Sequence, residues 1–495
     1  MSPSAIATAS PRRRAPSPRV AIAAGGALVL IAAAVAVPLL ADGPYELQRF
    51  HSRPDLRPPQ IQVSRAPAVG SGYIFVAPKN GPGPAGPMIL DRRGQLVWFK
   101  HLPKGIQAFD FKPQRYRGRP VLTWWEGHSA KGNGAGVDVI ADSSYRVIAR
   151  LPMPRGSRAD LHEFSLTSRG TAIVPVYRPV RRDLRSVGGP AHGRAIEGVI
   201  REVDVATGRV VFEWHSLDHV AVSESYKKFA DRSSQGYDYF HLNSIREEAG
   251  GRLLVSARHT NAVYEIDKRT GAVRWRLGGK RSSFAMGRGT RFAAQHDARR
   301  GPRGTISIFD NQAPPDRGRE SRVVVIELDR RARSARLVRQ YRHPAGVHSD
   351  SQGSAQFLPG GDLFVGWGGK SPRFSQFDAR GRMRFDARFR PGAANSYRAF
   401  LLPWRGQPAR RPALAVRERK DGRATVYASW NGATDLAAWE VLGGSRPDAM
   451  RRVAVAPRAA FETAIELGRT PRYVAVRALG RSGAPLRASR PVAVR

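Results

Sequence analysis

The chain has 495 residues, of which 41% are hydrophobic and 25% charged, and it includes 50 glycines and 37 prolines. This length predicts more than one domain, and the composition is that of a turn-rich folded protein, which excludes a largely disordered chain. The sequence contains no cysteine. Disulfides, iron–sulfur clusters, thiolate zinc sites and cysteine nucleophiles are therefore excluded.

The formal net charge is +42, from 82 Lys and Arg against 40 Asp and Glu. Such an excess is typical of nucleic-acid-binding proteins. Here, however, the basic residues are spread through every segment, and no helix-turn-helix, zinc-finger or RNA-binding motif accompanies them. We therefore expect no nucleic-acid partner. We expect instead a long-range positive field that concentrates small anions such as sulfate and phosphate esters.

The N-terminus has the pattern of a membrane anchor. Residues 1–19 form a basic tail, and an uncharged run of 22 residues follows from Val20 to Ala41. At about 1.5 Å per helical residue this run spans roughly the 30 Å of a bilayer core. Because the basic flank stays in the cytoplasm, we expect a single-pass transmembrane signal anchor with the rest of the chain outside the cell. Cleavage of the run as a signal peptide, followed by secretion, is the alternative.

Residues 42–71 are rich in proline and arginine, and they predict an extracellular stalk that wraps onto the first repeat. From residue 72 to residue 404 a pattern recurs in which an apolar strand reaches an aspartate, turns, and resumes as a second apolar strand, as in a β-hairpin. The aspartates are spaced by 51, 62, 63, 62 and 49 residues and are Asp91, Asp142, Asp204, Asp267, Asp329 and Asp378. A second hairpin precedes each one, starting with Gly72 to Pro78. Six repeats of two hairpins predict a six-bladed β-propeller.

The repeat stops after Trp404, and residues 405–412 read as a linker. Residues 413–495 contain strands such as Ala424 to Trp430 and Arg472 to Ala478. Their length and spacing predict a C-terminal β-sandwich of the immunoglobulin or fibronectin kind. The expected fold class is therefore all-β, with an N-terminal transmembrane helix.

Three histidines share one phase of the repeat. His162, His241 and His296 each precede by eight to ten residues the glycine that opens the next strand. Equivalent positions in a propeller lie at equivalent radii, so these imidazoles should converge at one mouth of the central channel. Arg258 ends the strand that pairs with the one beginning at His241, and Asn243 should project to the same face as His241. These five residues are the predicted catalytic set.

The imidazoles and Asp297 could alternatively bind zinc or iron. A guanidinium beside them disfavours a metal, and it suits an anion, because its planar fork of donors matches sulfate or phosphate oxygens. We therefore expect an anion site without metal or cofactor.

Five short sequence motifs lie at residues 122–127, 159–164, 237–244, 275–280 and 291–300, and the second, third and fifth of them include the three histidines. In these stretches the chain resembles the bacterial arylsulfotransferase family, in particular its actinobacterial membrane-anchored branch, over about residues 48 to 405. The resemblance implies transfer of a sulfuryl group from an aryl sulfate ester to a phenolic acceptor, without a phosphoadenosine cofactor.

By matching motif, the resemblance implies that His296 is the nucleophile that becomes a sulfohistidine. It implies that His241, Asn243 and Arg258 neutralise the sulfuryl oxygens, and that His162 binds the sulfuryl group or handles a proton. Two other classes of function stay open on the residues alone. One is a non-enzymatic extracellular propeller that binds a partner or serves as a scaffold, and the other is a metal- or quinone-dependent propeller enzyme.

Overall fold

The computed structural model describes residues 34–36, 47–65, 67–68, 70–130, 132–154, 156–229, 236–312, 320–369, 373–390 and 394–494. These residues form strands and four short 3-10 turns, η2 (Arg185–Val187), η3 (Ser216–Asp218), η4 (Val222–Glu224) and η5 (Pro302–Gly304), and no α-helix occurs among them. The expected all-β class is confirmed.

Residues 61 to 402 form six sheets of four or five strands. The first contains β3 (Tyr73–Val76), β4 (Met88–Leu90), β5 (Leu96–Phe99) and β28 (Phe400–Leu402). The second contains β6 (Gln107–Tyr116), β7 (Arg119–Ala130), β8 (Asn133–Ala141) and β9 (Val147–Arg150). The third contains β10 (Ser165–Leu166), β11 (Thr171–Arg182), β12 (Gly193–Asp204), β13 (Val210–His215) and β14 (Tyr237–Asp238).

The fourth sheet contains β15 (Leu242–Glu248), β16 (Arg252–Ala257), β17 (Ala262–Asp267) and β18 (Val273–Gly278). The fifth contains β20 (His296–Arg300), β21 (Ile306–Asp310), β22 (Arg322–Asp329), β23 (Ser334–Arg342) and β19 (Ala285–Met286). The sixth contains β24 (Ser354–Phe357), β25 (Leu363–Gly366), β26 (Arg373–Phe377), β27 (Met383–Phe389) and β2 (Ile61–Arg65).

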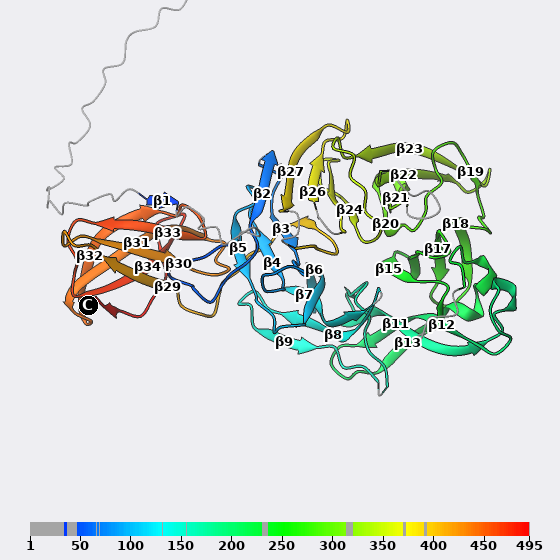
Figure 1. Ribbon diagram of the computed structural model, residues 1–495, viewed down its shortest axis with the longest axis horizontal. Coiled ribbons are helices and arrows are strands. Elements are labelled where there is room, and N and C mark those ends of the chain that lie inside the picture. The colour runs from blue at the N-terminus through cyan, green and yellow to red at the C-terminus, as the bar shows by residue number, and fades with distance from the viewer. Residues whose placement is uncertain are drawn as a thin grey trace, which may run out of the picture.

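The six sheets stand around one axis, as Figure 1 shows. Contacts between neighbouring sheets run from β6 through β10 and β11 to β15, then to β20, β24 and β28, and from β28 back to β6. The first strand of each sheet therefore lines the axis. This is the arrangement of a β-propeller.

The six aspartates of the sequence repeat each lie in the turn between the third and fourth strands of a sheet. The Asp91 carboxylate, for example, accepts hydrogen bonds from the backbone N–H groups of Arg93 at 2.8 Å and Gln95 at 2.9 Å. Asp329 accepts in the same way from Arg331 and Ala332. An aspartate at this position supplies the acceptor that a tight turn needs, which explains why the repeat is visible in the sequence.

Two expectations about the ends of the ring were wrong. The innermost strand of the first sheet does not come from a hairpin within Gly72 to Pro78, because β28 supplies it from the other end of the ring and pairs with β3. The segment expected as a stalk on the first repeat instead contributes β2, which pairs with β27 of the sixth sheet. Both exchanges cover strand edges with hydrogen-bonded backbone, and the pairing of β28 with β3 closes the ring.

Apolar side chains fill the space between neighbouring sheets. In one cluster Leu254 and Val263 of the fourth sheet pack against Ile306 and Val324 of the fifth, and all four are fully buried. Burial of such faces is the main stabilising term of the ring. Polar side chains of the first strands are left to line the axis.

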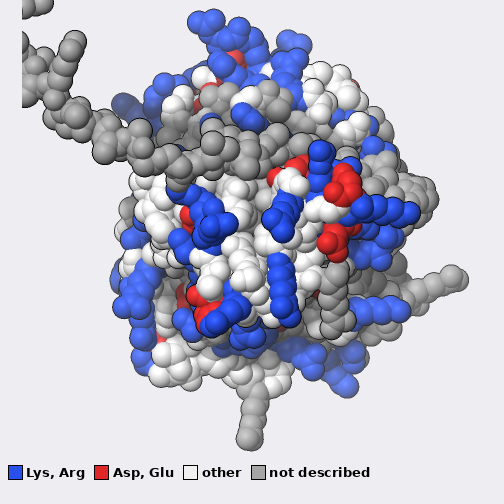
Figure 2. Space-filling view, turned by 90° about the vertical axis from the view of Figure 1, so that its left-hand side faces the viewer, with Lys and Arg blue, Asp and Glu red and all other residues white. Residues whose placement is uncertain are grey.

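The C-terminal residues form two further sheets. One contains β29 (Ala413–Glu418), β30 (Ala424–Ser429), β33 (Glu462–Leu467) and β1 (Ala34–Ala36), and the other contains β31 (Leu436–Arg446), β32 (Ala449–Pro457), β34 (Tyr473–Gly480), β35 (Pro485–Ala488) and β36 (Val492–Ala493). A shared core, which includes Val426, Trp439, Ile465 and Val476, packs one sheet on the other. Figure 2 looks at this end of the molecule, where lysine and arginine side chains are scattered rather than gathered in one stripe.

The C-terminal sheets are attached to the ring by buried hydrogen bonds. The Glu462 carboxylate accepts from the backbone N–H of Ser52 at 2.6 Å and of His51 at 3.1 Å. The Asn431 side chain exchanges two hydrogen bonds with the backbone of Phe99, both at 3.0 Å. The Asn431 contacts join the C-terminal sheets to the first sheet of the ring, and the Glu462 contacts join β33 to residues 51–52, which precede the ring.

Most of the expected membrane anchor, residues 20–41, lies outside the described residues. Its residues 34–36 are described, and they form β1, which pairs with β33. Within the ranges that the structure describes, no helix is long and apolar enough to span a bilayer.

Candidate functional site

The three predicted histidines lie at the start of first strands. His241 directly precedes β15, His296 is the first residue of β20, and His162 lies three residues before β10. All three are buried, with exposed fractions of 3% for His162, 6% for His241 and 2% for His296. The repeat phase therefore corresponds to one end of the axial strands.

The structure brings the histidines together around a tyrosine. The ring centroids of His162 and His241 are 4.9 Å apart. Tyr397 lies 5.8 Å from His162 and 6.3 Å from His296, measured between ring centroids. Segments that are 134 residues apart in the sequence, as His162 and His296 are, thus contribute to one cluster.

Backbone irregularities position this cluster. His241 and Asp297 adopt left-handed conformations, with φ of 53° and 52°, which non-glycine residues rarely adopt. The register of β15 on β16 shifts between Leu242 and Ser244, and that of β20 on β21 shifts between His296 and Arg299. Such bulges redirect side chains, and they are common beside active sites.

The bulge changes the expected placement of Asn243. We inferred from strand alternation that Asn243 shares a face with His241, but alternation does not hold across the shift. The Asn243 amide nitrogen donates to the Gln295 carbonyl at 2.7 Å, and its side-chain oxygen is buried without a hydrogen-bond partner among the described residues. The second amide N–H of Asn243 is the donor that it can offer to a ligand.

Arg258 is held by two carbonyl groups. Its backbone N–H donates to the His241 carbonyl at 2.9 Å, as the predicted strand pairing requires. Its guanidinium donates to the Ala294 carbonyl at 3.0 Å and to the Asp350 carbonyl at 2.9 Å. The cation is therefore fixed in orientation beside the histidines while no carboxylate neutralises it through these bonds.

Each histidine uses Nδ1 for a structural hydrogen bond, which leaves Nε2 for the centre of the cluster. Nδ1 of His162 bonds to Asp160, and Nδ1 of His241 lies 2.5 Å from Asp238. The partner of His296 is instead the neutral amide oxygen of Asn311, at 2.7 Å.

The tautomer of His296 follows from these bonds. The Asn311 amide nitrogen donates to the carbonyls of Ser349 at 2.9 Å and Gln352 at 3.0 Å, so its oxygen must accept from His296 Nδ1–H. The backbone N–H of Gln352 donates to His296 Nε2 at 3.2 Å. This network assigns the proton to Nδ1 and the lone pair to Nε2.

Electrostatics keep His296 neutral. Burial, followed by the positive charge of Arg258, lowers the pKa of His296 well below its usual value. Burial also lowers the pKa of His241, although the Asp238 carboxylate opposes that shift. A neutral imidazole with an available lone pair is a nucleophile, whereas an imidazole paired with a carboxylate is better suited to carry a proton.

The sequence analysis missed four residues of this cluster. Tyr397 lies among the histidines, and Tyr177 lies 6.1 Å from His241 between ring centroids. His259, which does not share the repeat phase of the three predicted histidines, packs on His241 at 4.6 Å between ring centroids. Asn311 is the fourth. None of the four is a histidine at the shared repeat position. Tyr397 nevertheless lies three residues before β28, just as His162 lies three residues before β10.

The hairpin of β7 and β8 also reaches the site. A Cβ atom on Gly132 would lie 3.4 Å from Cε1 of His241, and Gly132 has a φ of 88°. Glycine at this position allows the hairpin tip to approach the imidazole closely. The tip of the β7–β8 hairpin, which contains Gly132, thus borders the histidine cluster.

One group could hold a metal. The ligand atoms of Asp238, His241 and His259 all lie within 4.8 Å of one another. Two of the available nitrogens are already hydrogen-bonded, since Nδ1 of His241 contacts the Asp238 carboxylate and Nδ1 of His259 lies 2.7 Å from the Asp238 carbonyl. The charge of Arg258 lowers the pKa of His259 further, after burial, and the same charge disfavours a cation there.

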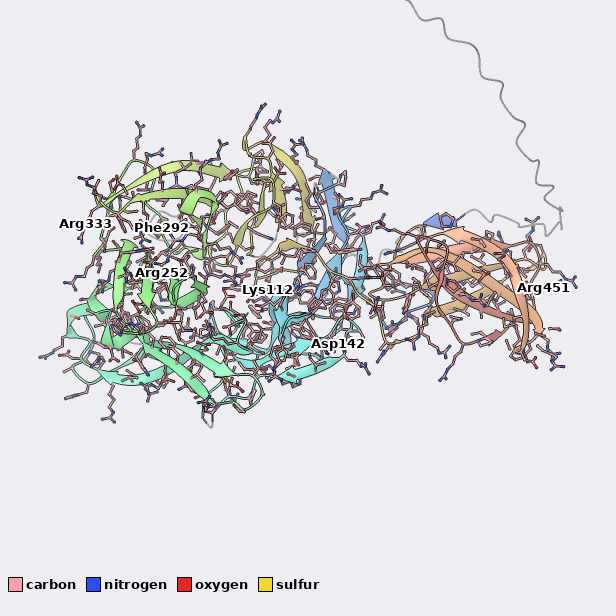
Figure 3. All side chains as sticks on the ribbon, turned by 180° about the vertical axis from the view of Figure 1, so that it is seen from behind. Lys112, Asp142, Arg252, Phe292, Arg333 and Arg451 are labelled. Carbon is pink, nitrogen blue, oxygen red and sulfur yellow. The ribbon has the colours of Figure 1, made fainter. Side chains whose placement is uncertain are left out.

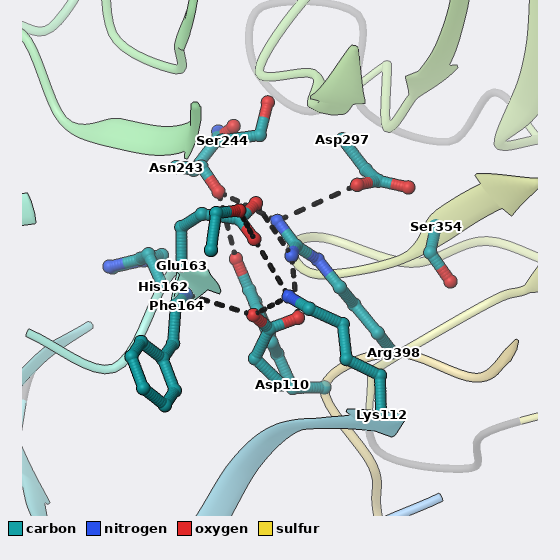
Figure 4. A network of polar contacts seen from close by, with 12 residues as sticks. Asp110, Lys112, His162, Glu163, Phe164, Asn243, Ser244, Asp297, Ser354 and Arg398 are labelled. Atoms are coloured by element: carbon teal, nitrogen blue, oxygen red, sulfur yellow. Dashed lines mark hydrogen bonds and ion pairs between the residues drawn. The ribbon is translucent and has the colours of Figure 1, made fainter. Parts of the chain in front are cut away.

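A buried ion network forms the floor of the cluster, as Figure 4 shows. The guanidinium of Arg398 is fully buried and donates to Asp110 at 2.7 Å, to Glu163 at 3.0 Å and to the Asn243 carbonyl at 2.8 Å. Lys112 bonds to Asp110 and lies 2.8 Å from Glu163. The network links the first four sheets directly beneath the histidines.

The comparisons with known proteins give one family. A family model described as arylsulfotransferase (ASST) matches residues 112–390, which is more than half of the chain. No curated protein matches the chain.

Several solved structures have a related overall shape. A protein of unknown function from Bacteroides caccae is 13% identical, covers 66% of this chain and 98% of its own, and has a TM-score of 0.41. Virginiamycin B lyase from Staphylococcus aureus is 8% identical over 75% of this chain and 97% of its own, with a TM-score of 0.35. A Swd1 β-propeller domain from Myceliophteria thermophila is 12% identical over 67% and 98%, with a TM-score of 0.29.

We predict that Arg398→Met destabilises the chain by about 3 to 5 kcal/mol, because it leaves the Asp110 and Glu163 carboxylates buried without their main cation. The measurement is the shift in thermal unfolding midpoint. Arg405→Met is the matched control, since the exposed Arg405 pairs only with Asp435 and should change the midpoint little. Equal shifts in the two variants would contradict a dominant role for the network.

We also predict that the imidazole of His296 stays neutral as the pH falls through 6.5, the usual histidine pKa, because its own pKa lies well below that value. Asn311→Asp places a carboxylate on Nδ1 and should raise this pKa, so protonation then occurs at higher pH. Nitrogen NMR of the histidine side chains measures both. Asn431→Asp, remote from the site, is the control. Protonation of His296 near pH 6.5 in the unsubstituted chain would refute the assignment.

Proposed function

The chain belongs to the arylsulfotransferase family, and from this premise we propose that it transfers a sulfuryl group from an aryl sulfate ester to a phenolic acceptor through a sulfohistidine at His296. The observation that carries this proposal is the tautomer of His296. Its Nδ1 is fixed by a neutral amide at 2.7 Å, so the lone pair is on Nε2, where it accepts only a 3.2 Å hydrogen bond from the Gln352 N–H among the described residues, and burial and Arg258 lower the pKa of the ring.

In the first step Nε2 of His296 attacks the sulfur atom and forms an N–S bond while the S–O bond to the aryl group breaks. The electron pair of that bond leaves with the phenolate oxygen. An attacking nitrogen that is already neutral needs no prior proton removal. The Gln352 N–H, which lies 3.2 Å from Nε2, must give way to the sulfur.

Negative charge on the sulfuryl oxygens and the leaving oxygen needs donors that are already in place. Arg258 supplies a guanidinium oriented by two carbonyls, and Asn243 supplies an amide N–H. His241 and His162 each have a carboxylate on Nδ1, which orients both rings and leaves Nε2 available to the substrate. We assign His241 to the sulfuryl oxygens and His162 to protonation of the phenolate.

In the second step the acceptor phenol gives its proton back to His162, and its oxygen attacks the sulfur. The N–S bond breaks and returns the electron pair to Nε2. Charges and protons balance over the two steps, so no external cofactor is required. Tyr397 and Tyr177 are placed to contact the aryl groups, since both rings lie within 6.1 Å of a site histidine.

We further propose that the six sheets are the blades of a six-bladed propeller with a C-terminal immunoglobulin- or fibronectin-like sandwich. On the sequence pattern, the chain is proposed to be anchored in the cell membrane by residues 20–41, with the propeller outside, as in the actinobacterial branch that it resembles.

The proposed intermediate is testable by mass spectrometry. Brief incubation with a chromogenic aryl sulfate should add about 80 Da, the mass of SO3, to the peptide that contains His296. His296→Ala should abolish both the adduct and sulfate exchange with a phenol. His192→Ala, an exposed histidine, is the control and should retain both. Full activity of His296→Ala would sink the proposal, and loss of activity with a chelator would favour the metal trio instead.

Replacement of Arg258 tests the electrostatic role. Arg258→Lys keeps a positive charge but loses the planar fork, so we expect kcat/KM to fall by roughly 100-fold or more, the usual effect of losing an oriented transition-state donor. Steady-state kinetics with the same aryl sulfate measure this. Arg274→Lys, in an outer strand of the fourth sheet, is the control. An unchanged kcat with only a raised KM would indicate that Arg258 serves ground-state binding.

A further inference from the structure

A second basic pocket lies at the other end of the axial strands. It has a volume of about 820 Å³, and its lining includes six arginines and two glutamates, which are Arg246, Arg252, Arg299, Arg300, Arg303, Arg330, Glu247 and Glu248. Arg252 is labelled in Figure 3, which shows the molecule from behind. None of these residues belongs to the histidine cluster.

The strand directions separate this pocket, here called the arginine pocket, from the histidine cluster. β15 runs from beside His241 to Glu248, and β20 runs from His296 to Arg300. Arg299 and Arg300 lie three and four residues beyond His296 on β20, or roughly 10 to 13 Å along the strand at about 3.3 Å per residue. A small molecule in one site cannot contact the other.

The carboxylates on the floor of the arginine pocket are each shared among several cations. Asp297 lies 2.7 Å from Arg299, 3.7 Å from Arg246 and 3.7 Å from Arg398, and Glu163, at 3.5 Å from Arg246, already pairs with Lys112 and Arg398. One Arg299 nitrogen and two Arg246 nitrogens are buried with no hydrogen-bond partner within the described ranges. Burial, and then the charge of Arg246, lower the pKa of Arg299, so this part of the floor is electrostatically unsatisfied.

Other arginines at the rim are already oriented. Glu248 binds Arg300 at 2.9 Å and 2.7 Å, and Glu265 lies 3.2 Å from both Arg300 and Arg330. Guanidinium groups held in this way lose little side-chain entropy when an anion binds.

Two arginines of the pocket remain without any such pairing. Arg252 and Arg303 form no ion pair with a carboxylate in the part of the chain that the structure describes. Arg303 has a φ of 54° in the turn η5, a conformation that costs a non-glycine residue about 1 to 2 kcal/mol.

We infer that the arginine pocket is a second anion site, separate from the catalytic cluster, for a compact ligand that carries at least two sulfate or phosphate groups. A single monovalent anion could neutralise only one of the two unpaired guanidinium groups, Arg252 and Arg303. Two multiply charged oxyanion groups can contact Arg252 and Arg303 at the rim and compensate the excess charge of Arg246 and Arg299 on the floor. Phe357 and Leu328, which also line the pocket, suit a ligand with an apolar or sugar scaffold.

The test is calorimetric titration of the purified full-length chain with two probes, inorganic pyrophosphate and a disulfated disaccharide. At least one should bind in the micromolar range and more weakly as salt rises. The double variant Arg252→Ala/Arg303→Ala should bind roughly tenfold more weakly or worse, as expected for the loss of charge-assisted contacts. Binding of pyrophosphate alone would identify a phosphorylated ligand, and binding of the disaccharide alone a sulfated one.

Two controls separate specific from general charge effects. Arg209→Ala/Arg269→Ala removes the same charge from exposed turns of neighbouring sheets and should leave the affinity unchanged, as should Arg258→Ala at the histidine cluster. Aryl sulfate turnover should be normal in Arg252→Ala/Arg303→Ala, which keeps this test independent of the proposed reaction. The inference is overturned if neither probe binds, if the Arg209 and Arg269 control loses affinity equally, or if only Arg258→Ala loses it.

Discussion

The fully buried guanidinium of Arg398 is the interaction on which the axial site depends. It binds Asp110 from β6, Glu163 beside β10 and the Asn243 carbonyl in β15, and it comes from the segment that precedes β28. A charge in such a place is tolerated only because each bond is made to a different sheet. The ring must therefore close, with β28 paired to β3, before this network is complete.

Above this network, the three histidines differ in the partner that each one has on Nδ1. Carboxylates accept from His162 and His241, whereas an amide accepts from His296. Because a carboxylate favours the imidazolium and an amide does not, three similar side chains acquire different roles. Burial and Arg258 act in the same direction on His296, so its nucleophilic form does not depend on substrate.

The sequence predicted those features that repeat, and it missed those that depend on ring closure. The turn aspartates recur every 49 to 63 residues, and the three histidines each stand eight to ten residues before a glycine that opens the next strand, so pattern alone located them and predicted their convergence. Asn311 and Arg398 each occur once, and their contacts follow from neighbouring sheets rather than from spacing. The sequence nevertheless contained a pattern that could have located Arg398. In four sheets an aromatic or histidine residue beside the axis is followed directly by a charged residue, at Phe109-Asp110, His162-Glu163, His296-Asp297 and Tyr397-Arg398.

That pairing also explains why positive charge gathers at both ends of the axial strands. Two of the carboxylates that follow these aromatic side chains, Asp110 and Glu163, form buried ion pairs with Arg398 and Lys112. Few carboxylates are left for Arg258 at one end or for Arg252 and Arg303 at the other. In a chain of formal charge +42, the long-range field brings anions to the surface, and the local shortage of carboxylates selects where they bind. The internal pairing of the acids thus leaves both ends of the axial strands positively charged, which supports the two proposed anion sites.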